Sequence, residues 1–490
     1  MCNITGPIRG ITRARPDAVA VIRADGSAIS YAELDRAIDR MAIHASALGL
    51  RAGDIAGLTI AGPDESLGLI LALGLARIGV ASAPPSLPRE YLRLCFQAAA
   101  PGQPVEPGRV RFDATWLPRG SPGSDDRAVA MHPDPAAVCT VVATSGTTGE
   151  PKYVPLSHAV LTRRTYGGMR GLAQVRATRI IAVGLGGALG FACILRTLWT
   201  GGTLVLTNPR AAPAAIRRHG VSSIVASPAT LREMLDALPA DAAPFPMLGA
   251  IEVAGSALPT KLQRLAAGRL CPNIVSYFGS SEAGGIASAP VPRLASRPGA
   301  VGYAWPGVEI QAVDGFGNAL PPGETGLLRV RGDGAAEGYL GDPAASAAHF
   351  RDGWFWSGDL GAVWPDGMVT LTGRASDLID AGGFKVSPRV IEDALLALPL
   401  VTDAAAFGVP DGTGIEQIWA AIVARTRIDD TVLNAFCRRA LPGMSPKIIV
   451  QVKALPRNEN GKLLRDALVA LAMRIARDDH AAAPSEAVPR

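Results

Sequence analysis

Residues 144–152 read Thr-Ser-Gly-Thr-Thr-Gly-Glu-Pro-Lys. The segment follows an apolar, β-branched run at residues 138–143, which is typical of a buried strand. It precedes a step at Ser157-His158, after which a helix can open. Its glycines permit positive φ angles, its hydroxyl and backbone N–H groups can donate to a polyanion, and Lys152 adds positive charge. The spacing is not that of a P-loop, because the lysine follows a proline. The stretch therefore predicts a phosphate-binding loop, with a solvated turn as the simpler alternative.

Length and composition limit the class of protein. The chain has 490 residues, of which 48% are hydrophobic, so we expect two or three well-packed domains. The net charge of +5 is small for this length, and no basic run supports nucleic acid as a partner. The 6 cysteines lie far apart, which argues against structural zinc or a disulfide framework and favours a reducing compartment. No segment has the pattern of a signal peptide or an integral membrane span, so a soluble, cytoplasmic protein is expected.

The order of predicted elements indicates an α/β fold. Strands and helices alternate up to about residue 298, and one helix is predicted to begin after Ser30 as its N-cap, with Glu33 completing the cap. Residues 101–135, rich in Pro and Gly, are predicted to be a surface excursion. We expect a large N-terminal region, residues 1–373, made of two α/β sheet subdomains and a small β-barrel at about 299–373. A small, mobile α+β C-terminal domain should follow at 374–477, and a disordered tail at 478–490.

The C-terminal domain has its own pattern of elements. The predicted helices and strands are the helix 388–398, the strands 403–409 and 418–424, the helix 431–441 and the strand 448–452. In the N-terminal region, residues 184–191 match a dinucleotide fingerprint only loosely, because Leu189 stands where the last glycine is required. Glycines that allow close packing explain that segment better.

Five stretches stand in one order along the chain. They are the loop 144–152, residues 278–282, Ser357-Gly358-Asp359, Gly373-Arg374 with Gly383 beyond it, and Pro456 with Gly461-Lys462. This set resembles the acyl-activating, adenylate-forming (AMP-binding) superfamily, and most of all its acyl- and aryl-CoA ligases. The resemblance extends from about residue 15 to residue 466. It implies an ATP-dependent acid–thiol ligase that forms an acyl-adenylate and releases AMP and pyrophosphate, with ATP, Mg²⁺ and coenzyme A as cofactors.

The resemblance also implies a role for individual residues. Lys462, Glu282, Thr148 and Arg374 are expected to be catalytic, and Glu282 and Thr148 are expected at the Mg²⁺ ion. Asp359 should accept the ribose hydroxyls, and residues 276–278 should border adenine. The expected cofactor-binding residues are Thr144, Ser145, Gly146, Thr147, Thr148, Gly149, Lys152, Ser276, Tyr277, Phe278, Gly279, Ser281, Asp359, Arg374, Lys462, Gly382 and Gly383.

Two positions depart from the family pattern. Ser376 stands where an Asp or Lys is usual at the hinge between the domains, and Leu327 replaces the glutamate of a Gly-Glu-Leu step. Neither belongs to the proposed chemistry, so the resemblance still implies an active enzyme.

Small residues mark the expected acyl pocket. Its members by resemblance are Gly187, Ala188, Gly255, Ser256, Ala283 and Gly284. No aspartate that would bind an α-amine occurs there, so a carboxylic acid with an apolar or aromatic body is the expected substrate. Gly382 and Gly383 resemble the loop beside the pantetheine tunnel, which favours coenzyme A as acceptor and leaves a free carrier protein as the alternative.

Two functions of other classes remain open at this point. Residues 279–283 partly resemble the nucleophile elbow of α/β-hydrolases, but the last glycine is missing and only His349 or His480 follows as a partner. The other alternative is a non-catalytic nucleotide-binding protein, which release of pyrophosphate in the presence of acids would exclude. The identity of the acid and the oligomeric state are not encoded in these motifs.

Overall fold

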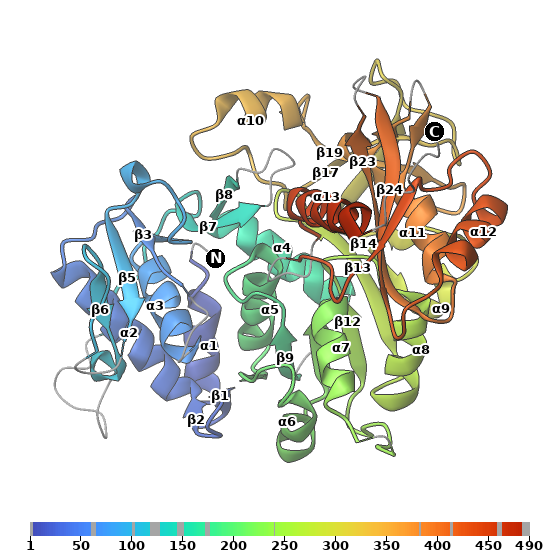
Figure 1. The fold of residues 1–490 in the computed structure, drawn as a ribbon. Coiled ribbons are helices and arrows are strands. Elements are labelled where there is room, and N and C mark those ends of the chain that lie inside the picture. The colour runs from blue at the N-terminus through green and yellow to red at the C-terminus, as the bar shows by residue number, and fades with distance from the viewer. Residues whose placement is uncertain are drawn as a thin grey trace, which may run out of the picture. The chain divides into compact units, whose positions relative to one another are not determined.

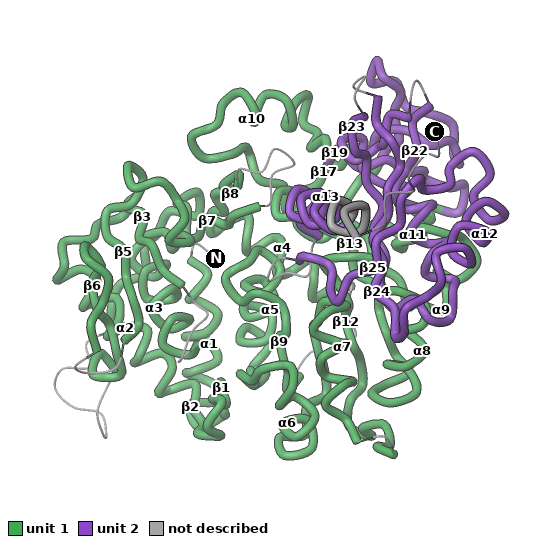
Figure 2. Tube along the Cα trace, viewed as in Figure 1, with its two compact units in different colours: residues 1–310, 329–356, 367–369 green, residues 311–328, 357–366, 370–490 purple. Residues whose placement is uncertain are grey.

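The computed structural model describes residues 3–59, 65–99, 103–117, 128–144, 151–171, 177–239, 241–381, 384–411, 415–457 and 463–482. The chain divides into two compact units (Figure 2). Unit 1 comprises residues 1–310, 329–356 and 367–369, and unit 2 comprises residues 311–328, 357–366 and 370–490. The domain boundary predicted after residue 373 stays a prediction.

A first sheet forms the N-terminal part of unit 1. The elements there are α1 (Gly6–Ala14), α2 (Tyr31–Ala47), β3 (Ile55–Gly57), α3 (Glu65–Arg77), β4 (Ala81–Ala83), the 3-10 helix η1 (Arg89–Tyr91), β5 (Leu94–Ala98), β6 (Val110–Phe112), η2 (Ala114–Trp116), β7 (Val138–Thr144) and β8 (Lys152–Ser157). The strands lie in the order β6-β5-β3-β4-β7-β8, parallel except for the antiparallel pair β7–β8 (Figure 1).

A second sheet of unit 1 carries the remaining part of the alternating pattern. Its elements are β1 (Val19–Ile22), β2 (Ala28–Ser30), α4 (His158–Gly171), β9 (Thr178–Ala182), α5 (Ala188–Trp199), β10 (Thr203–Val205), α6 (Ala212–His219), β11 (Ser223–Ala226), α7 (Pro228–Asp236), β12 (Ala250–Val253), α8 (Thr260–Arg269), β13 (Ile274–Ser280), β14 (Gly284–Pro290), α9 (Val291–Leu294) and β15 (Ala300–Ala304). The strand order is β15-β14-β13-β12-β11-β9-β10-β1-β2. Its central strands, from β13 to β1, are parallel, as the alternation of strands and helices predicts.

Unit 1 also contains a segment that returns to it later in the chain. This segment holds α10 (Pro343–His349) and β18 (Phe350–Arg351), the latter paired with Phe355 and Trp354. Four strands contribute residues to both units, namely β16 (Val308–Val313), β17 (Gly326–Gly332), β19 (Trp354–Val363) and β20 (Met368–Arg374).

Unit 2 contains a small α+β arrangement. Its elements are η3 (Ala375–Asp377), β21 (Ile379–Asp380), β22 (Lys385–Val386), α11 (Pro388–Leu396), β23 (Val401–Pro410), β24 (Glu416–Ala424), α12 (Asp430–Ala440), β25 (Ile448–Gln451) and α13 (Arg465–Ala482). Side chains alternate across the sheet β23-β24-β25. Ala404 and Ala406 pack in one buried cluster, and Ala405 and Phe407 pack in another on the opposite face. This part of the predicted element order is confirmed, with ends shifted by one or two residues.

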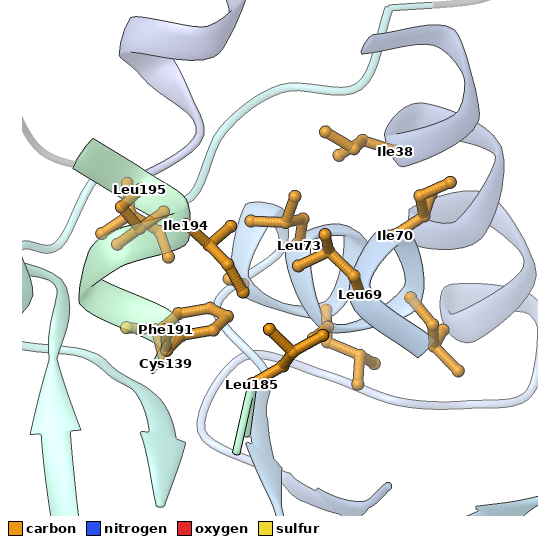
Figure 3. Packing of buried hydrophobic residues seen from close by; sticks show 14 of the residues in the cluster. Ile38, Leu69, Ile70, Leu73, Cys139, Leu185, Phe191, Ile194 and Leu195 are labelled. Carbon is orange, nitrogen blue, oxygen red and sulfur yellow. The ribbon is translucent and has the colours of Figure 1, made fainter. Parts of the chain in front are cut away.

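The largest core lies between the helices of unit 1. In α3 every residue from Ser66 to Arg77 is buried, so the helix carries apolar residues on all sides. Figure 3 shows its residues Leu69 and Leu73 facing Phe191 and Ile194 of α5. The apolar run around residues 181–206 is therefore a set of core elements, as the sequence indicates. No helix in the described ranges is long and apolar enough to cross a membrane.

The structure confirms the helix start at Ser30. The Ser30 hydroxyl accepts the Glu33 backbone N–H, and the Glu33 carboxylate accepts the Ser30 N–H, which completes a capping box for α2.

Three sequence-based expectations are corrected. Residues 152–157, to which the sequence prediction assigned no strand, form β8, and the proline within it is tolerated because β8 lies at the edge of the sheet, next to β7. Part of the surface excursion predicted at residues 101–135 is strand β6, which pairs with β5. Phe112 of this strand is fully buried, so the segment belongs to the sheet and its core. The last helix, α13, extends to Ala482, so residues 478–482 of the predicted tail are helical.

His158 fixes the turn from β8 into α4 and should make stability depend on pH. Its ring is fully buried, and Nδ1 accepts the Ile4 N–H at 3.2 Å. Burial, with a contribution from His132, lowers the pKa of His158 from 6.5 to about 4. The unfolded state therefore binds the proton more tightly than the folded state. The contribution of neutral His158 to the free energy of unfolding is complete above pH 6.5 and is lost as the pH falls towards 4.

We expect the free energy of unfolding to drop by up to about 3 kcal/mol over this interval. Denaturant unfolding at several pH values, for the wild type and for His158→Asn, measures this contribution. Equal pH slopes in the two proteins would contradict it.

Candidate active site

The candidate acyl-pocket residues lie at the carboxyl ends of the strands of the second sheet. Strands β9, β11, β12 and β13 are parallel neighbours, so the segments that leave their carboxyl ends emerge together. Gly187 and Ala188 follow β9, Gly255 and Ser256 follow β12, and residues 281–283 follow β13, with Gly284 at the start of β14. The structure thus brings these segments to the edge at which ligands bind in open α/β sheets.

The glycines after β9 serve close packing. A Cβ atom at Gly190 would lie 2.2 Å from the carbonyl oxygen of Gly184, so no other residue fits there. Gly187 is the N-cap of α5, with extended backbone angles. Gly190 therefore serves close packing, as the packing interpretation of this segment predicts.

The two ends of the predicted phosphate loop are held side by side. Thr144, the last residue of β7, pairs with Lys152, the first residue of β8. The intervening candidates Ser145, Gly146, Thr147, Thr148 and Gly149 lie outside the described residues. A β-hairpin therefore positions the loop, although the sequence predicted a strand on one side of it only.

A cluster of polar side chains joins Lys152 to Glu282. Lys152 Nζ lies 3.4 Å from His349 Nε2 and 5.1 Å from the centre of the Tyr339 ring. The Tyr339 hydroxyl donates to Glu282 Oε1 at 3.0 Å. The His349 and Tyr339 rings meet edge to face, with centroids 5.9 Å apart. One cation and one carboxylate of the predicted site are thus connected through residues that are distant in sequence.

The hydrogen bonds of His349 define its tautomer. Nδ1 lies 2.9 Å from the carbonyl oxygen of Trp356, which can only accept, so Nδ1 carries the hydrogen. In the neutral ring Nε2 is then an acceptor, which suits a donor from the Lys152 ammonium group. His349 Nε2 is therefore engaged by Lys152, which it orients.

The backbone around Glu282 is held firmly. Its carbonyl oxygen accepts from Arg164 Nη2 at 2.9 Å and from the Ala336 N–H at 2.7 Å. The Ser280 hydroxyl accepts the Ala283 N–H at 3.0 Å and closes the turn after β13. Because both backbone and side chain have fixed partners, the carboxylate is preorganised.

The residues present fit a role at a hard cation. Glu282 has one oxygen hydrogen-bonded to Tyr339, and carboxylate oxygen is the ligand type that Mg²⁺ prefers. No group of three or more His, Cys, Asp or Glu side chains suited to a metal occurs in the described ranges. Mg²⁺ at nucleotide sites is held by one or two carboxylates, substrate phosphates and water, so one protein carboxylate is sufficient.

The three residues predicted to border adenine point to different faces of β13. Tyr277 packs edge to face on Trp305, with ring centres 5.0 Å apart, and its hydroxyl lies close to Gly285. Successive side chains of a strand point to opposite faces, so Ser276 and Phe278 face away from Tyr277. Burial raises the pKa of the Tyr277 hydroxyl well above its ordinary value. The Tyr277 side chain thus lies beside the candidate acyl-pocket segment at residues 283–285, on the face opposite to Ser276 and Phe278.

Unit 2 contains a second part of the predicted set. Arg374 Nε, at the end of β20, donates to Asp359 Oδ1 at 3.1 Å. The Ser357 hydroxyl accepts the Asp359 N–H, and Asp359 is 9% exposed. The carboxylate is thus oriented by an arginine that the sequence also selected.

Three further candidates lie outside the described residues: Lys462, Gly382 and Gly383. The last two fall between the paired strands β21 and β22, and Lys462 directly precedes Leu463, which pairs with Arg457. At the predicted hinge, the Ser376 hydroxyl donates to Asp377, and Asp377 forms an ion pair with Arg465 at 3.1 Å.

The sequence did not place Tyr339, His349 or Arg164 in this site, and it named His349 only as a possible partner in the hydrolase alternative. Each lies between recognised motifs, and its contacts reach 57, 197 and 170 residues along the chain. A single tyrosine, histidine or helical arginine carries no local pattern that reveals such partners.

Comparison with known proteins now defines the family. The family described as "AMP-binding enzyme" matches residues 10–340, and "AMP-binding enzyme C-terminal domain" matches residues 390–462. The chain belongs to the AMP-binding enzyme family. The family assignment and the α/β fold class predicted from the sequence are therefore both confirmed.

Similar members of the AMP-binding family include CoA ligases and carrier-protein ligases. Feruloyl-CoA synthase of an Amycolatopsis species is 30% identical, over 94% of this chain and 96% of that protein. Salicyl-AMP ligase / salicyl-S-ArCP synthetase of Mycobacterium tuberculosis is 29% identical, over 93% and 88%. The fold is similar to that of MenE, the O-succinylbenzoate coenzyme A synthetase of Bacillus subtilis. That structure, with ATP and magnesium, has a TM-score of 0.82, 22% identity, and coverage of 94% of this chain and 99% of that one.

Proposed function

We propose that this protein ligates a carboxylic acid to coenzyme A. In the first step the carboxylate attacks the α-phosphate of ATP, forming an acyl-adenylate and releasing pyrophosphate. In the second step the thiol of coenzyme A attacks the acyl carbon, and AMP leaves. The observation that supports this most is the carboxylate of Glu282, held by Tyr339 beside the cation of Lys152.

The chain's own residues have distinct tasks in this proposal. Lys152 and the hydroxyl-rich loop before it would balance the negative charge of the leaving pyrophosphate. Glu282 and Thr148 would hold Mg²⁺, which when bound supplies positive charge at the phosphate oxygens. Asp359, oriented by Arg374, would accept both ribose hydroxyls, since a carboxylate matches a vicinal diol. The remaining candidates keep the adenine, acyl and pantetheine roles given by the family resemblance, except Tyr277, which we reassign to the acyl side.

A free carrier protein is the second candidate acceptor. The similarity to the salicyl-AMP ligase / salicyl-S-ArCP synthetase supports it, because that protein's name includes a carrier-protein product. The cytoplasm remains the proposed location for either reaction.

An acid panel tests the function and the acceptor together. Pyrophosphate release is measured with ATP and each acid, and thioester formation is then measured with coenzyme A or with a phosphopantetheinylated carrier protein. Acid-dependent pyrophosphate release followed by a CoA thioester supports the proposal. Thioester formation only on the carrier protein would select the alternative, and ATP binding without pyrophosphate release would indicate a non-catalytic protein.

Lys462 should separate the two half-reactions. By resemblance, its ammonium group stabilises charge only while the carboxylate attacks the α-phosphate. Loss of one preorganised charge costs about 10²–10³-fold in rate. We expect Lys462→Ala to lose adenylation by this factor and to convert a supplied acyl-adenylate and coenzyme A at nearly the wild-type rate.

Gly383→Trp is the complementary variant. It should spare pyrophosphate release and block the thioester step, because the indole would fill the predicted pantetheine path. Equal damage to both half-reactions in Lys462→Ala would contradict the role given to this lysine.

A further inference from the structure

Arg164 is a buried cation that forms no ion pair with a carboxylate within the part of the chain that the structure describes. It lies on α4 and is 8% exposed. Its Nε donates to the carbonyl oxygen of Gly334 at 2.7 Å, and its Nη2 donates to that of Glu282. Its Nη1 is also buried, and it has no hydrogen-bond partner among the described residues.

The charge of Arg164 is therefore incompletely balanced. A buried ion is costly unless it is paired and all its hydrogens are bonded. A guanidinium group stays charged in proteins, so the third nitrogen of Arg164 offers a strong donor to an anion.

A second buried arginine, Arg196, differs from Arg164 in having a carboxylate partner. Arg196 of α5 makes two hydrogen bonds to the Glu252 carboxylate, at 2.9 and 2.7 Å. Tyr277 interacts electrostatically with both arginines. The chain supplies a counter-ion for Arg196, whereas the ion pairs found among the described residues include none for Arg164.

Arg164 lies directly beside the candidate acyl-pocket segment. A Cβ atom at Gly284 would lie 2.9 Å from Arg164 Nε, and one at Gly285 would lie 2.7 Å from the Tyr277 hydroxyl and 2.9 Å from Trp305. Both glycines thus let a guanidinium, a phenol and an indole approach the loop that follows β13.

We propose that Arg164 binds a second anionic group of the acid substrate, so that the preferred substrate class is dicarboxylic acids. This inference rests on the proposed ligase function and specifies the acid. The carboxylate that reacts is then distinct from the carboxylate that accepts from Nη1. A phosphate group of ATP is the other anion that could approach Arg164, and the kinetic constants for the two substrates distinguish these sources.

The first test needs no variant. Pyrophosphate release is measured with a dicarboxylic acid, with its monomethyl ester and with the monocarboxylic acid of equal length. Because a hydrogen bond to a charged partner is lost, kcat/KM should fall about 10- to 100-fold for the ester and the monoacid. Equal values for all three acids would overturn the proposal for Arg164. No pyrophosphate release with any acid would instead overturn the proposed ligase function.

The second test compares two arginines of one helix. Arg164→Met should lower kcat/KM for the diacid about 10- to 100-fold more than for the monoacid, because loss of the hydrogen bond to the Glu282 carbonyl affects both acids alike. Its KM for ATP should stay near the wild-type value, and calorimetric binding of the diacid to the ATP-free protein should weaken equally. Arg163→Met, in which an exposed neighbour is replaced, is the matched control and should resemble the wild type.

The remaining outcomes also decide the question. A rise in the KM for ATP alone would assign the anion to the nucleotide, and equal loss for diacid and monoacid would assign Arg164 a structural role. If Arg164→Met does not fold, Arg164→Lys, which keeps the positive charge, is measured in its place. The first test, which compares the three acids on the wild-type protein, decides the proposal without any variant.

Discussion

Replacing Glu282 with glutamine is expected to slow acid-dependent pyrophosphate release by about 10²–10³-fold. The amide has the size of the carboxylate and can still accept the hydrogen bond from Tyr339, so the shape of the site is preserved. The contacts from Arg164 and Ala336 reach the backbone carbonyl and are unaffected by the change. The loss therefore reports the charge of Glu282, because a neutral amide is a poorer ligand than a carboxylate for a hard cation.

Pyrophosphate release over a series of Mg²⁺ concentrations measures this effect, and the shift of the Mg²⁺ dependence is the main readout. Protection of the protein by Mg²⁺ and ATP against thermal unfolding provides a second readout without turnover. Glu337→Gln, at an exposed glutamate of the same region, is the matched control. Wild-type turnover of Glu282→Gln at limiting Mg²⁺ would show that the role is assigned to the wrong residue.

Tyr339 should act through Glu282 and not on the substrate. Its hydroxyl orients the carboxylate, so Tyr339→Phe should cost about 3- to 10-fold, much less than loss of the charge. A double variant with Glu282→Gln should add little to the single change, because coupled residues are not additive.

The element order could be read from the sequence because it depends on local pattern. Capping at Ser30 and the alternation in residues 403–424 concern neighbours along the chain, and the structure bears both out. Strand β8 was missed because Pro155 is normally excluded from strands and its edge position is a property of the whole sheet. Strand β6 was missed because its short apolar core is surrounded by turn-forming residues.

The sequence proposes candidate site residues where the chemistry lies in a motif. Lys152, Glu282, Asp359 and Arg374 were selected from their own stretches, and the structure gives each a defined contact. The buried ion pairs that stabilise the fold could not be predicted from the sequence. Arg77, fully buried, pairs with Asp39 at 2.8 Å, and Arg196 pairs with a residue 56 positions later. Nothing local distinguishes such an arginine from one on the surface.

Asp359→Ala is expected to lower kcat/KM for ATP by about 10²–10⁴-fold. The proposed contact consists of two hydrogen bonds from ribose hydroxyls to an ionised carboxylate, each of which contributes roughly 1.5–3 kcal/mol. Asp359 is well placed for this because Arg374 and Ser357 fix its side chain and backbone within unit 2. The change should appear mainly in the KM for ATP, since the ribose is remote from the reacting phosphorus.

Substrate analogues make this prediction specific to the ribose. The wild-type protein should lose a similar factor when ATP is replaced by 2′,3′-dideoxy-ATP, whereas Asp359→Ala should use both nucleotides equally well. Asp236→Ala, at an exposed carboxylate at the end of α7, is the matched control and should keep the wild-type preference. If Asp359→Ala still discriminates between ATP and the dideoxy analogue, the carboxylate does not contact the ribose. Its burial and its pairing with Arg374 would then serve only to stabilise the strands β19 and β20.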